Sequence, residues 1–434
     1  MFQRYEMCIA HEWDGLNNAP NACERPLLDD RPFPSVYDDD SPDVRIAAVG
    51  DLHGDWACLI RLLELSRMCT LLRSDDGRVV EACRWSGGPH DYLVVCGDCV
   101  DMKRGDDDPV AEVAYAEWKI LLLLSQLCAE SDGHVIRLVG NHEMMLLDGE
   151  ATYRTRRSVR NDERRAHGDW RRLWRQTDGI YRKLVASHGG YRAVVRINRW
   201  IFCHGGVPHR LVEQLHAEHR IDGDRTLEYV NRFYHRVVVE NLSRAEMHAR
   251  HGISDTLYHQ LWQVLWTRVY ATPSLDARAP CDEFMRMIDR LYPTPPGGEA
   301  YRLVVAHCVQ PSHGRLPYTT EPSSVSIRTL LPQRAIDVSA RVASHVYDAQ
   351  THACIYPRAP DAPPECPPYV GVNGDCADAT SAHTPRVFRI DCAMSHAFDA
   401  LFDATPAMRF AREPQILVVT QVDGASRVAI HRFR

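Results

Sequence analysis

This 434-residue sequence has few lysines, no long apolar run and no net positive charge. The formal net charge is −7, which argues against a broad basic face that covers nucleic-acid phosphates. The longest apolar stretch, around residues 120–124, is far too short to span a bilayer. The first fifteen residues lack the basic and apolar regions of a secretory signal. We therefore expect no nucleic-acid binding, no membrane segment and no signal peptide.

Cysteine is present but forms no dense framework. The fifteen cysteines are scattered singly, and an odd number leaves at least one thiol unpaired. Hydrophobic residues make up 45% of the chain and charged residues 25%, which is ordinary for a globular protein. These features predict a soluble, cytoplasmic protein in a reducing compartment.

Composition along the chain predicts one large domain with an extension and two insertions. Residues 1–44 lack helical or strand periodicity and indicate a loop-rich N-terminal extension, followed by a domain over residues 45–434. Residues 150–183 form an Arg-rich, helical insertion, and residues 312–385 form a loop-like insertion rich in Pro, Ala and Cys. The basic insertion has three interpretations: a solvated helix face, a rim that faces an anionic ligand, or a partner-docking surface.

Three segments repeat the order strand, polar loop, helix. The apolar runs VRIAAVG, DYLVVCG and HVIRLVG lead into GDLHGD, GDCVD and GNHE, and a helical pattern follows each. This order predicts an α/β sheet with helices on its faces. Further strands are expected at residues 194–203, 301–306, 387–391 and 415–421. Polar residues just past such strands are where open α/β sheets place their sites.

Side chains that can bind metal follow these apolar runs. They are Asp51, His53, Asp98, Asn141, His204 and His307. Asp51 and His53 are two apart, so an extended backbone would point both to one side. Asp98 has two oxygens and can bridge two cations, while His142, beside Asn141, can transfer a proton. Each residue alone fits a turn or a hydrogen-bonded core position, and the conjunction of six is what predicts a metal site.

The ordered motifs GDLHG, GDCVDMKRG, GNHE, HGG and AH resemble the signature of the calcineurin-like metallophosphoesterases, and within them the phosphoprotein phosphatases. LWTRVY at residues 265–270 and IDCAMSHAF at residues 390–398 resemble elements of the bacterial-like, Shewanella-like branch. The resemblance implies a four-layer α/β/β/α sandwich with a metal site at the carboxyl ends of the strands. It also implies hydrolysis of phosphate monoesters by a metal-bridging hydroxide, with phosphorylated proteins or peptides (Ser/Thr or Tyr) as substrates.

The resemblance assigns the metal ligands to two ions. One ion would be held by Asp51, His53 and Asp98, and the other by Asp98, Asn141, His204 and His307. Such mixed nitrogen and oxygen ligands suit Mn, Fe or Zn. Two ions roughly 3.5–4 Å apart would lower the pKa of a shared water and clamp the phosphate oxygens.

The resemblance also assigns the proton donor and the phosphate contacts. His142 would protonate the leaving oxygen, and Asp101 would orient its imidazole. The expected phosphate contacts are Asn141, Arg268 and Arg104. Met102 and Lys103 intervene before Arg104, where the family has its arginine directly after the aspartate.

Two other functions stay open. One is hydrolysis of a dinucleoside polyphosphate or another small phosphate ester, for which Trp170 and Trp174 would be stacking platforms unless they pack the helices. The other is a metal-binding scaffold that has lost turnover. Cys308, next to a predicted ligand, is interpreted as a small packed residue rather than an oxidation-sensitive thiol.

Overall fold

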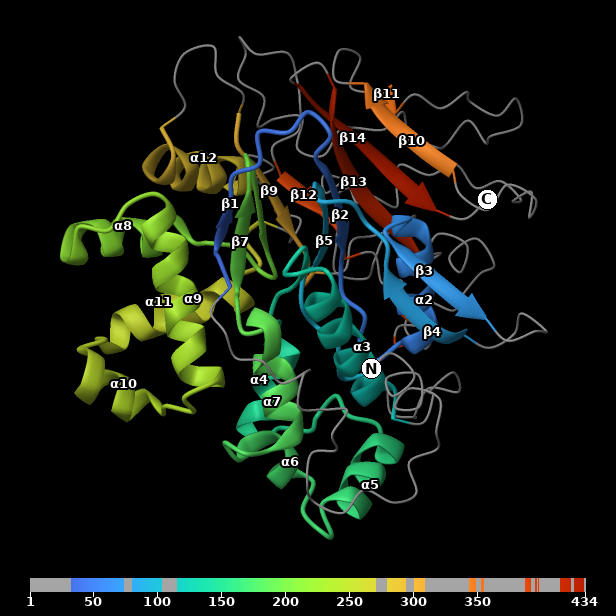
Figure 1. Ribbon diagram of the computed structural model, residues 1–434. Helices are drawn as coiled ribbons and strands as arrows, with labels where there is room; N and C mark the ends of the chain where they lie inside the picture. The colour runs from blue at the N-terminus through green and yellow to red at the C-terminus, as the bar shows by residue number, and fades with distance from the viewer. Residues whose placement is uncertain are drawn as a thin grey trace, which may run out of the picture.

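Two β-sheets form the centre of the protein (Figure 1). The computed structural model describes residues 33–73, 80–103, 115–270, 279–293, 300–308, 343–348, 353–354, 387–391, 395, 397, 414–422 and 425–432. Within these residues, one sheet has the strand order β11 (Ala353–Cys354), β10 (Ala343–Asp348), β14 (Ala425–Arg432), β13 (Gln415–Val422), β2 (Arg45–Val49), β5 (Asp91–Val95), β6 (Val135–Arg137). The other has the order β1 (Val36–Tyr37), β7 (Val194–Ile197), β8 (Trp200–Cys203), β9 (Arg302–Val305), β12 (Val387–Arg389). The predicted mixed α/β fold is confirmed.

The middle of the larger sheet is parallel, as the repeated strand–loop–helix order predicts. β2 pairs in parallel with β5, and β5 with β6. Residues 46–49 and 92–95 are buried, which explains their nearly continuous apolar sequence. Parallel strands end at the same edge, so the loops after β2, β5 and β6 meet there.

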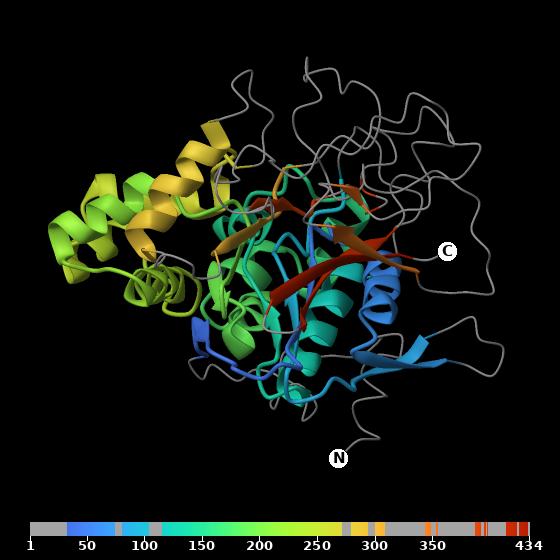
Figure 2. The same cartoon turned by 90° about the horizontal axis from the view of Figure 1, so that it is seen from above.

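Helices cover both sides of the sheets. α2 (Trp56–Ser66) contacts β13, α3 (Ala116–Glu130) contacts β6, and α9 (Asp224–Val238) contacts β7. In the view from above, α2 and α3 lie on one side of the sheets and the helices of residues 209–291 on the other (Figure 2). The remaining helices are α4 (Asn141–Asp148), α5 (Arg156–Arg165), α6 (Arg171–Arg175), α7 (Ile180–Ala186), α8 (His209–His219), α10 (Arg244–His251), α11 (Asp255–Trp266) and α12 (Ala279–Leu291), with a short 3-10 helix at Ser187–Gly189 and a hairpin of β3 (Cys69–Arg73) and β4 (Val80–Trp85). No helix in the described part has the length and apolarity needed to cross a membrane.

The segment expected as one strand at residues 194–203 is a hairpin of β7 and β8. Asn198 takes a left-handed backbone (φ 49°), which turns the chain after Ile197. The Asn198 side chain stabilises the turn, because it accepts from the N–H of Asp39 and donates to its carbonyl (2.8 and 2.9 Å). The apolar pattern alone does not reveal the turn.

Parts of the predicted extension and insertions belong to regular structure. Within residues 1–44, β1 pairs in parallel with β7 and so extends the smaller sheet. α5, α6 and the start of α7 lie within residues 150–183. β10 and β11 lie within residues 312–385, where loops were expected; β10 pairs with β14, which offers its backbone groups to an added strand. The rest of that insertion lies outside the described residues.

Candidate metal centre

The loop after β2 carries Asp51 and His53. His53 has a left-handed backbone (φ 45°), so the chain turns here instead of continuing as an extended strand. The Nδ1 of His53 lies 3.3 Å from the carbonyl oxygen of Val100, which can only accept, so Nδ1 donates and Nε2 is left with its lone pair. That Nε2 lies 3.7 Å from Oδ2 of Asp51. The two predicted ligands face each other, but through a tight turn rather than through the extended backbone that their spacing suggested.

Asp98 lies at the centre of the cluster and is fixed by Glu143. Glu143 accepts hydrogen bonds from the backbone N–H groups of Asp98, Cys99 and Gly140 (3.0, 2.6 and 2.8 Å). Oδ1 of Asp98 accepts from the N–H of His142 at 2.9 Å. Burial alone would raise the pKa of Asp98, but His204 and the other nearby histidines outweigh it and hold that pKa well below its usual value. Asp98 is therefore an ionised carboxylate with Oδ2 turned toward the histidines.

Two side-chain oxygen atoms face the Nε2 of His204, and a backbone carbonyl faces its Nδ1. Its Nδ1 lies 2.8 Å from the carbonyl oxygen of Cys96 and so carries the proton. Its Nε2 lies 2.8 Å from Oδ1 of Asn141 and 3.3 Å from Oδ2 of Asp98. Burial opposes a protonated His204, yet the Asp98 carboxylate outweighs it and raises the pKa. The oxygen atoms of Asp98 and Asn141 therefore favour a positive charge between them and the Nε2 of His204, which a proton on that Nε2 or a bound cation would supply.

His307 follows β9 and faces the same centre. Its ring lies 4.9 Å from the ring of His204, and its backbone N–H donates to Oδ1 of Asp51 at 3.3 Å. Burial and the charge of His204 lower the pKa of His307 to about 3, and the charge of Arg268 also contributes. Nε2 of His307 is buried and has no hydrogen-bond partner among the described residues. A neutral imidazole with an unused lone pair is a suitable metal ligand.

Two groups of candidate metal-binding side chains share Asp98. One is Asp98, His204 and His307, and the other is His53, Asp98 and His142; within each group the ligand atoms lie within 4.8 Å of one another. The second group contains His142 where the resemblance implied Asp51. Nε2 of His142 lies 3.8 Å from Oδ2 of Asp98, and Oδ2 of Asp51 is similarly placed beside His53. The imidazole, carboxylate and amide donors fit Mn, Fe or Zn.

His142 and Asp101 form a hydrogen-bonded pair at the rim of this centre. Nδ1 of His142 lies 2.9 Å from Oδ2 of Asp101, so Nε2 faces the centre. Burial raises the pKa of Asp101, although the hydrogen bond from His142 opposes this effect. The ring of the exposed Tyr153 packs edge-on against His142, with 4.9 Å between ring centroids. This pairing fixes the imidazole orientation that a proton donor needs.

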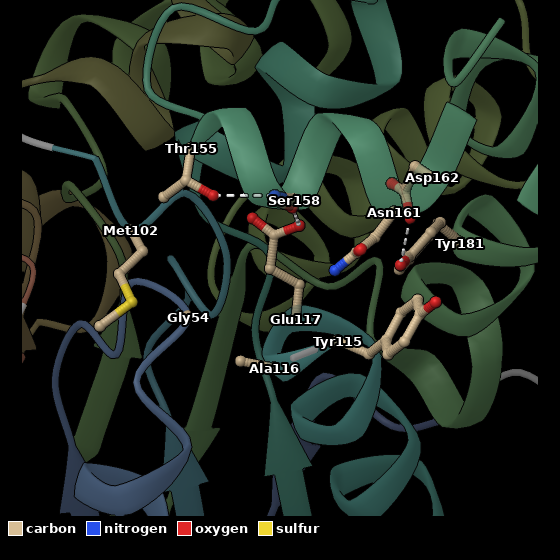
Figure 3. Close-up of a pocket in the computed structure, with 10 residues that line it drawn as sticks. All are labelled: Gly54, Met102, Tyr115, Ala116, Glu117, Thr155, Ser158, Asn161, Asp162 and Tyr181. Atoms are coloured by element: carbon tan, nitrogen blue, oxygen red, sulfur yellow. Dashed lines mark hydrogen bonds between the residues drawn. The ribbon is translucent and has the colours of Figure 1, made fainter. Parts of the chain in front are cut away.

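A buried charged network supports Asp101 from behind. Glu117 accepts from the backbone N–H of Asp101 (3.0 Å), from Arg154 (3.0 Å) and from the hydroxyl of Ser158 (2.7 Å). Arg154 also donates to Asp162 at 2.7 Å, and its side chain is 0% exposed. Figure 3 shows the Glu117 carboxylate pointing toward Ser158 in a small pocket that Asp162 also lines. The Arg-rich segment after α4 is thereby joined to the residue that orients His142.

The other predicted residues divide into three groups. Arg104 lies outside the described residues. Arg268 is exposed and near enough for its charge to affect the pKa of His307. Trp170, Trp174 and Cys308 are buried, and the Trp174 ring stacks on Tyr181, so both indoles pack the helices instead of forming an open stacking surface.

Sequence reasoning gave no role to Glu143, Glu117 or Tyr153. Glu143 has a sequence signal, since it stands third in α4, where a glutamate can reach back to the N-cap backbone. Glu117 and Tyr153 have none, because their contacts join residues far apart in the chain. Left-handed backbones at His53, Asp98, Asp101 and His307 were also not foreseen. Such backbone strain persists where the surrounding structure holds it, often at functional sites.

An α/β fold with this cluster at its strand ends is that of a metallophosphoesterase. Residues 44–261 match the family model of the calcineurin-like phosphoesterases, and the chain belongs to this family. It is similar to Shewanella-like protein phosphatase 2 of Arabidopsis thaliana, with 33% identity over 129 residues, 29% of this chain and 27% of that protein. It is also similar to Shewanella-like protein phosphatase 1 of Plasmodium berghei (strain Anka), with 25% identity over 295 residues, 65% of this chain and 66% of that protein. The predicted family is confirmed.

These matches span less than two thirds of either relative's length. Among solved structures, the chain is similar to a cold-active protein tyrosine phosphatase, with a TM-score of 0.51 and 15% identity over 95% of this chain and 87% of that chain. At that identity the likeness concerns the fold alone.

Proposed function

We propose that this chain is a metal-dependent phosphatase that hydrolyses phosphate monoesters of proteins or peptides. One observation carries the proposal: acceptor atoms of Asp98, Asn141 and His204 converge at a buried point beside the His142–Asp101 pair. Buried acceptors that face one another are costly unless a proton or a cation lies among them, and the neutral His307 beside them offers a further lone pair for a metal ion. A cation site beside an oriented proton donor is suited to cleaving a phosphate ester.

Each side chain has a role in this proposal. One ion would be held by Asp51, His53 and Asp98, and the other by Asp98, Asn141, His204 and His307. Two ions held there would polarise the phosphate oxygens and lower the pKa of a bound water. His142, oriented by Asp101, protonates the leaving oxygen. Arg268 and the Asn141 amide contact the phosphate, and an arginine can donate two hydrogen bonds to it.

The test is hydrolysis of p-nitrophenyl phosphate by metal-stripped protein resupplied with Mn, Fe or Zn. We expect activity in the wild type and its near-complete loss in Asp98→Asn. Arg250→Met, on the exposed surface of α10, should retain activity because its ion pair with Glu246 lies outside the site. If the wild type binds two metals per chain and stays inert with all three, the scaffold interpretation replaces the phosphatase.

Substrate class is tested by parallel assays on phosphopeptides and diadenosine tetraphosphate. The names of the relatives support a phosphoprotein substrate. The burial of Trp170 and Trp174 removes the two side chains that would have stacked a nucleotide base. We expect a higher kcat/KM for phosphopeptides carrying phosphoserine, phosphothreonine or phosphotyrosine. A marked preference for the dinucleotide would overturn the phosphoprotein proposal while leaving phosphoester hydrolysis intact.

A further inference from the structure

A basic groove of about 1090 Å³ lies away from the metal centre, lined by parts of α6, α7, α10 and α11. In Figure 1, α6 and α7 lie low in the middle of the view, and α10 and α11 lie to their left. The side chains that characterise the groove are Arg172, Arg175, Lys183, Arg244, Tyr258 and Trp262. Pockets for small ligands are typically about 300–1,000 Å³, so this groove is large enough for an extended chain.

The basic residues of the Arg-rich segment divide into structural and surface sets. Arg154 is buried against acidic partners, Arg165 stacks 3.7 Å from the Trp118 ring centroid, and Arg182 donates to the carbonyls of Trp174 and Val238 (3.1 and 2.9 Å). By contrast, the side chains of Arg172 and Lys183 make no hydrogen bond or ion pair with any described residue, and the charge of Arg175 interacts with Asp148 without a close ion pair; all three basic residues line the groove.

The groove is positive although the whole chain is negative. Six basic side chains line it, with Arg171 and Arg182 in addition to those above, against three carboxylates, Asp148, Asp169 and Asp178. Asp169 pairs with Arg171 at 3.6 Å, and Arg244 is held at 2.8 Å by Asp255, which does not line the groove. An unbalanced positive surface on a chain of net charge −7 is complementary to an acidic ligand.

Aromatic rings add an apolar strip beside the charges. Tyr258 and Trp262 stack with ring centroids 5.9 Å apart and planes 12° from parallel. The guanidinium of Arg244 lies 5.4 Å from the Tyr258 ring centroid. A peptide that carries both acidic and apolar side chains could contact the basic residues and the aromatic rings of the groove at the same time. A small inorganic anion would contact only the basic residues.

Two helices connect the groove to the metal centre. α4 begins with Asn141 and His142 and ends at Asp148, which lines the groove. Since each residue rises ~1.5 Å, His142 and Asp148 are about 9 Å apart along the helix axis. α11 contributes Tyr258 and Trp262 to the groove, and one turn later its Trp266 lies 6.3 Å from the His307 ring. The same two helices therefore carry residues of both the groove and the metal centre.

We infer that this groove docks an acidic segment of the phosphoprotein substrate, separate from the phosphorylated residue. The inference rests on the proposed phosphatase function. Because docking is separate from chemistry, the groove affects recognition of the protein substrate and has no effect on hydrolysis of a small ester.

The test is binding of a fluorescein-labelled, unphosphorylated peptide of glutamates with one central tyrosine, followed by fluorescence anisotropy. The variant is Arg172→Glu/Lys183→Glu. The matched control is Arg210→Glu on α8 together with Arg220→Glu at its C-cap, which makes the same charge change outside the groove. We expect the groove variant to weaken binding about tenfold or more and the control to leave it near the wild-type value. An oligonucleotide of equal charge and inorganic phosphate serve as competing probes.

The kinetic arm compares p-nitrophenyl phosphate with phosphopeptides that carry an acidic or a neutral tail. The groove variant should lower kcat/KM only for the acidic-tailed peptide and leave the other two substrates unchanged. Equal loss on all substrates, no binding of the peptide, or tighter binding of the oligonucleotide would overturn the inference. If the wild type hydrolyses nothing, the proposed function fails, and anisotropy still decides whether the groove binds the acidic peptide.

Discussion

At the scale of single residues, His142 and Asp101 are the pair whose removal is most informative. Under the proposed mechanism, His142→Ala removes a proton donor worth about 10²–10⁴ in rate, and Asp101→Ala removes the acceptor that fixes its ring. Loss of a donor slows esters with poor leaving groups more than those with good ones. We therefore expect a larger fall in kcat for an alkyl phosphate than for p-nitrophenyl phosphate. An equal fall in kcat for both esters, together with a lower metal content, would instead identify His142 as a metal ligand. Its Nε2, 3.8 Å from Oδ2 of Asp98, is close enough for that role.

Gly140 shows how closely the strand-end loops approach one another. A Cβ at Gly140 would lie 2.2 Å from Oδ1 of Asp98 and 2.3 Å from its backbone nitrogen. Gly140→Ala should therefore displace Asp98, lower the free energy of unfolding by about 1–3 kcal/mol and reduce metal affinity. Isothermal titration with Mn and urea denaturation measure both effects. Gly88→Ala is the control, since its nearest atom would be 3.8 Å away; similar losses in both variants would contradict the prediction.

At the scale of elements, Arg154 joins the helical segment α5–α6 to the metal centre. Removing one partner of a buried ion pair leaves an uncompensated charge, so Arg154→Met should cost about 3–5 kcal/mol in the free energy of unfolding. Arg250→Met breaks an exposed pair on α10 and should have a far smaller effect on the free energy of unfolding. Urea denaturation compares the two. Equal costs would show that the network around Glu117 does not hold the segment in place.

Adjacent strands β2 and β5 begin with an ion pair between Arg45 and Asp91, 2.8 Å apart. Burial would raise the pKa of Asp91, but hydrogen bonds from Arg45 outweigh it and lower the pKa. Folding therefore stabilises the ionised form of Asp91. The contribution of the pair to the free energy of unfolding is complete well above the unfolded pKa of about 3.9. It is lost as the pH falls through the lower pKa of the folded state. Asp91→Asn should reduce stability by about 1 kcal/mol near neutral pH. Urea titrations should show this difference shrinking in acid; a constant difference would exclude the pair as its cause.

At the scale of the whole molecule, the metal centre joins segments from both sheets. Asp51 and Asp98 follow strands of the larger sheet, and His204 and His307 follow strands of the smaller one. Ions that bind only the folded chain should increase its free energy of unfolding by about 2.7 kcal/mol when the free metal concentration is a hundred times Kd. The melting temperature should rise accordingly. Chelation followed by Mn titration under differential scanning fluorimetry measures this. Asp98→Asn, which lacks the shared ligand, should show little response to metal.

The domain organisation also belongs to this scale and stays a proposal. We propose one domain over residues 45–434 that carries two insertions, because β13 and β14 near the end of the chain complete the sheet begun by β2. β1 ties part of the preceding segment to the smaller sheet.

The sequence by itself determined the α/β class, the strand–loop–helix units and the side chains with metal-binding chemistry. These features are local, because strand and helix periods and glycine-bounded loops can each be recognised within a few consecutive residues. The pairing of His142 with Asp101 was expected from the family resemblance, and their 2.9 Å contact agrees with it.

Only the tertiary structure decided how these parts meet. The turn at Asn198, the left-handed backbone of His53 and the Glu117–Arg154 contact depend on neighbours brought together by packing. The same holds for the arginines: one sequence pattern yields Arg154 buried among carboxylates and Arg172 exposed in a groove. Periodicity reports which residues face a core, whereas partners distant in the chain are selected by the fold as a whole.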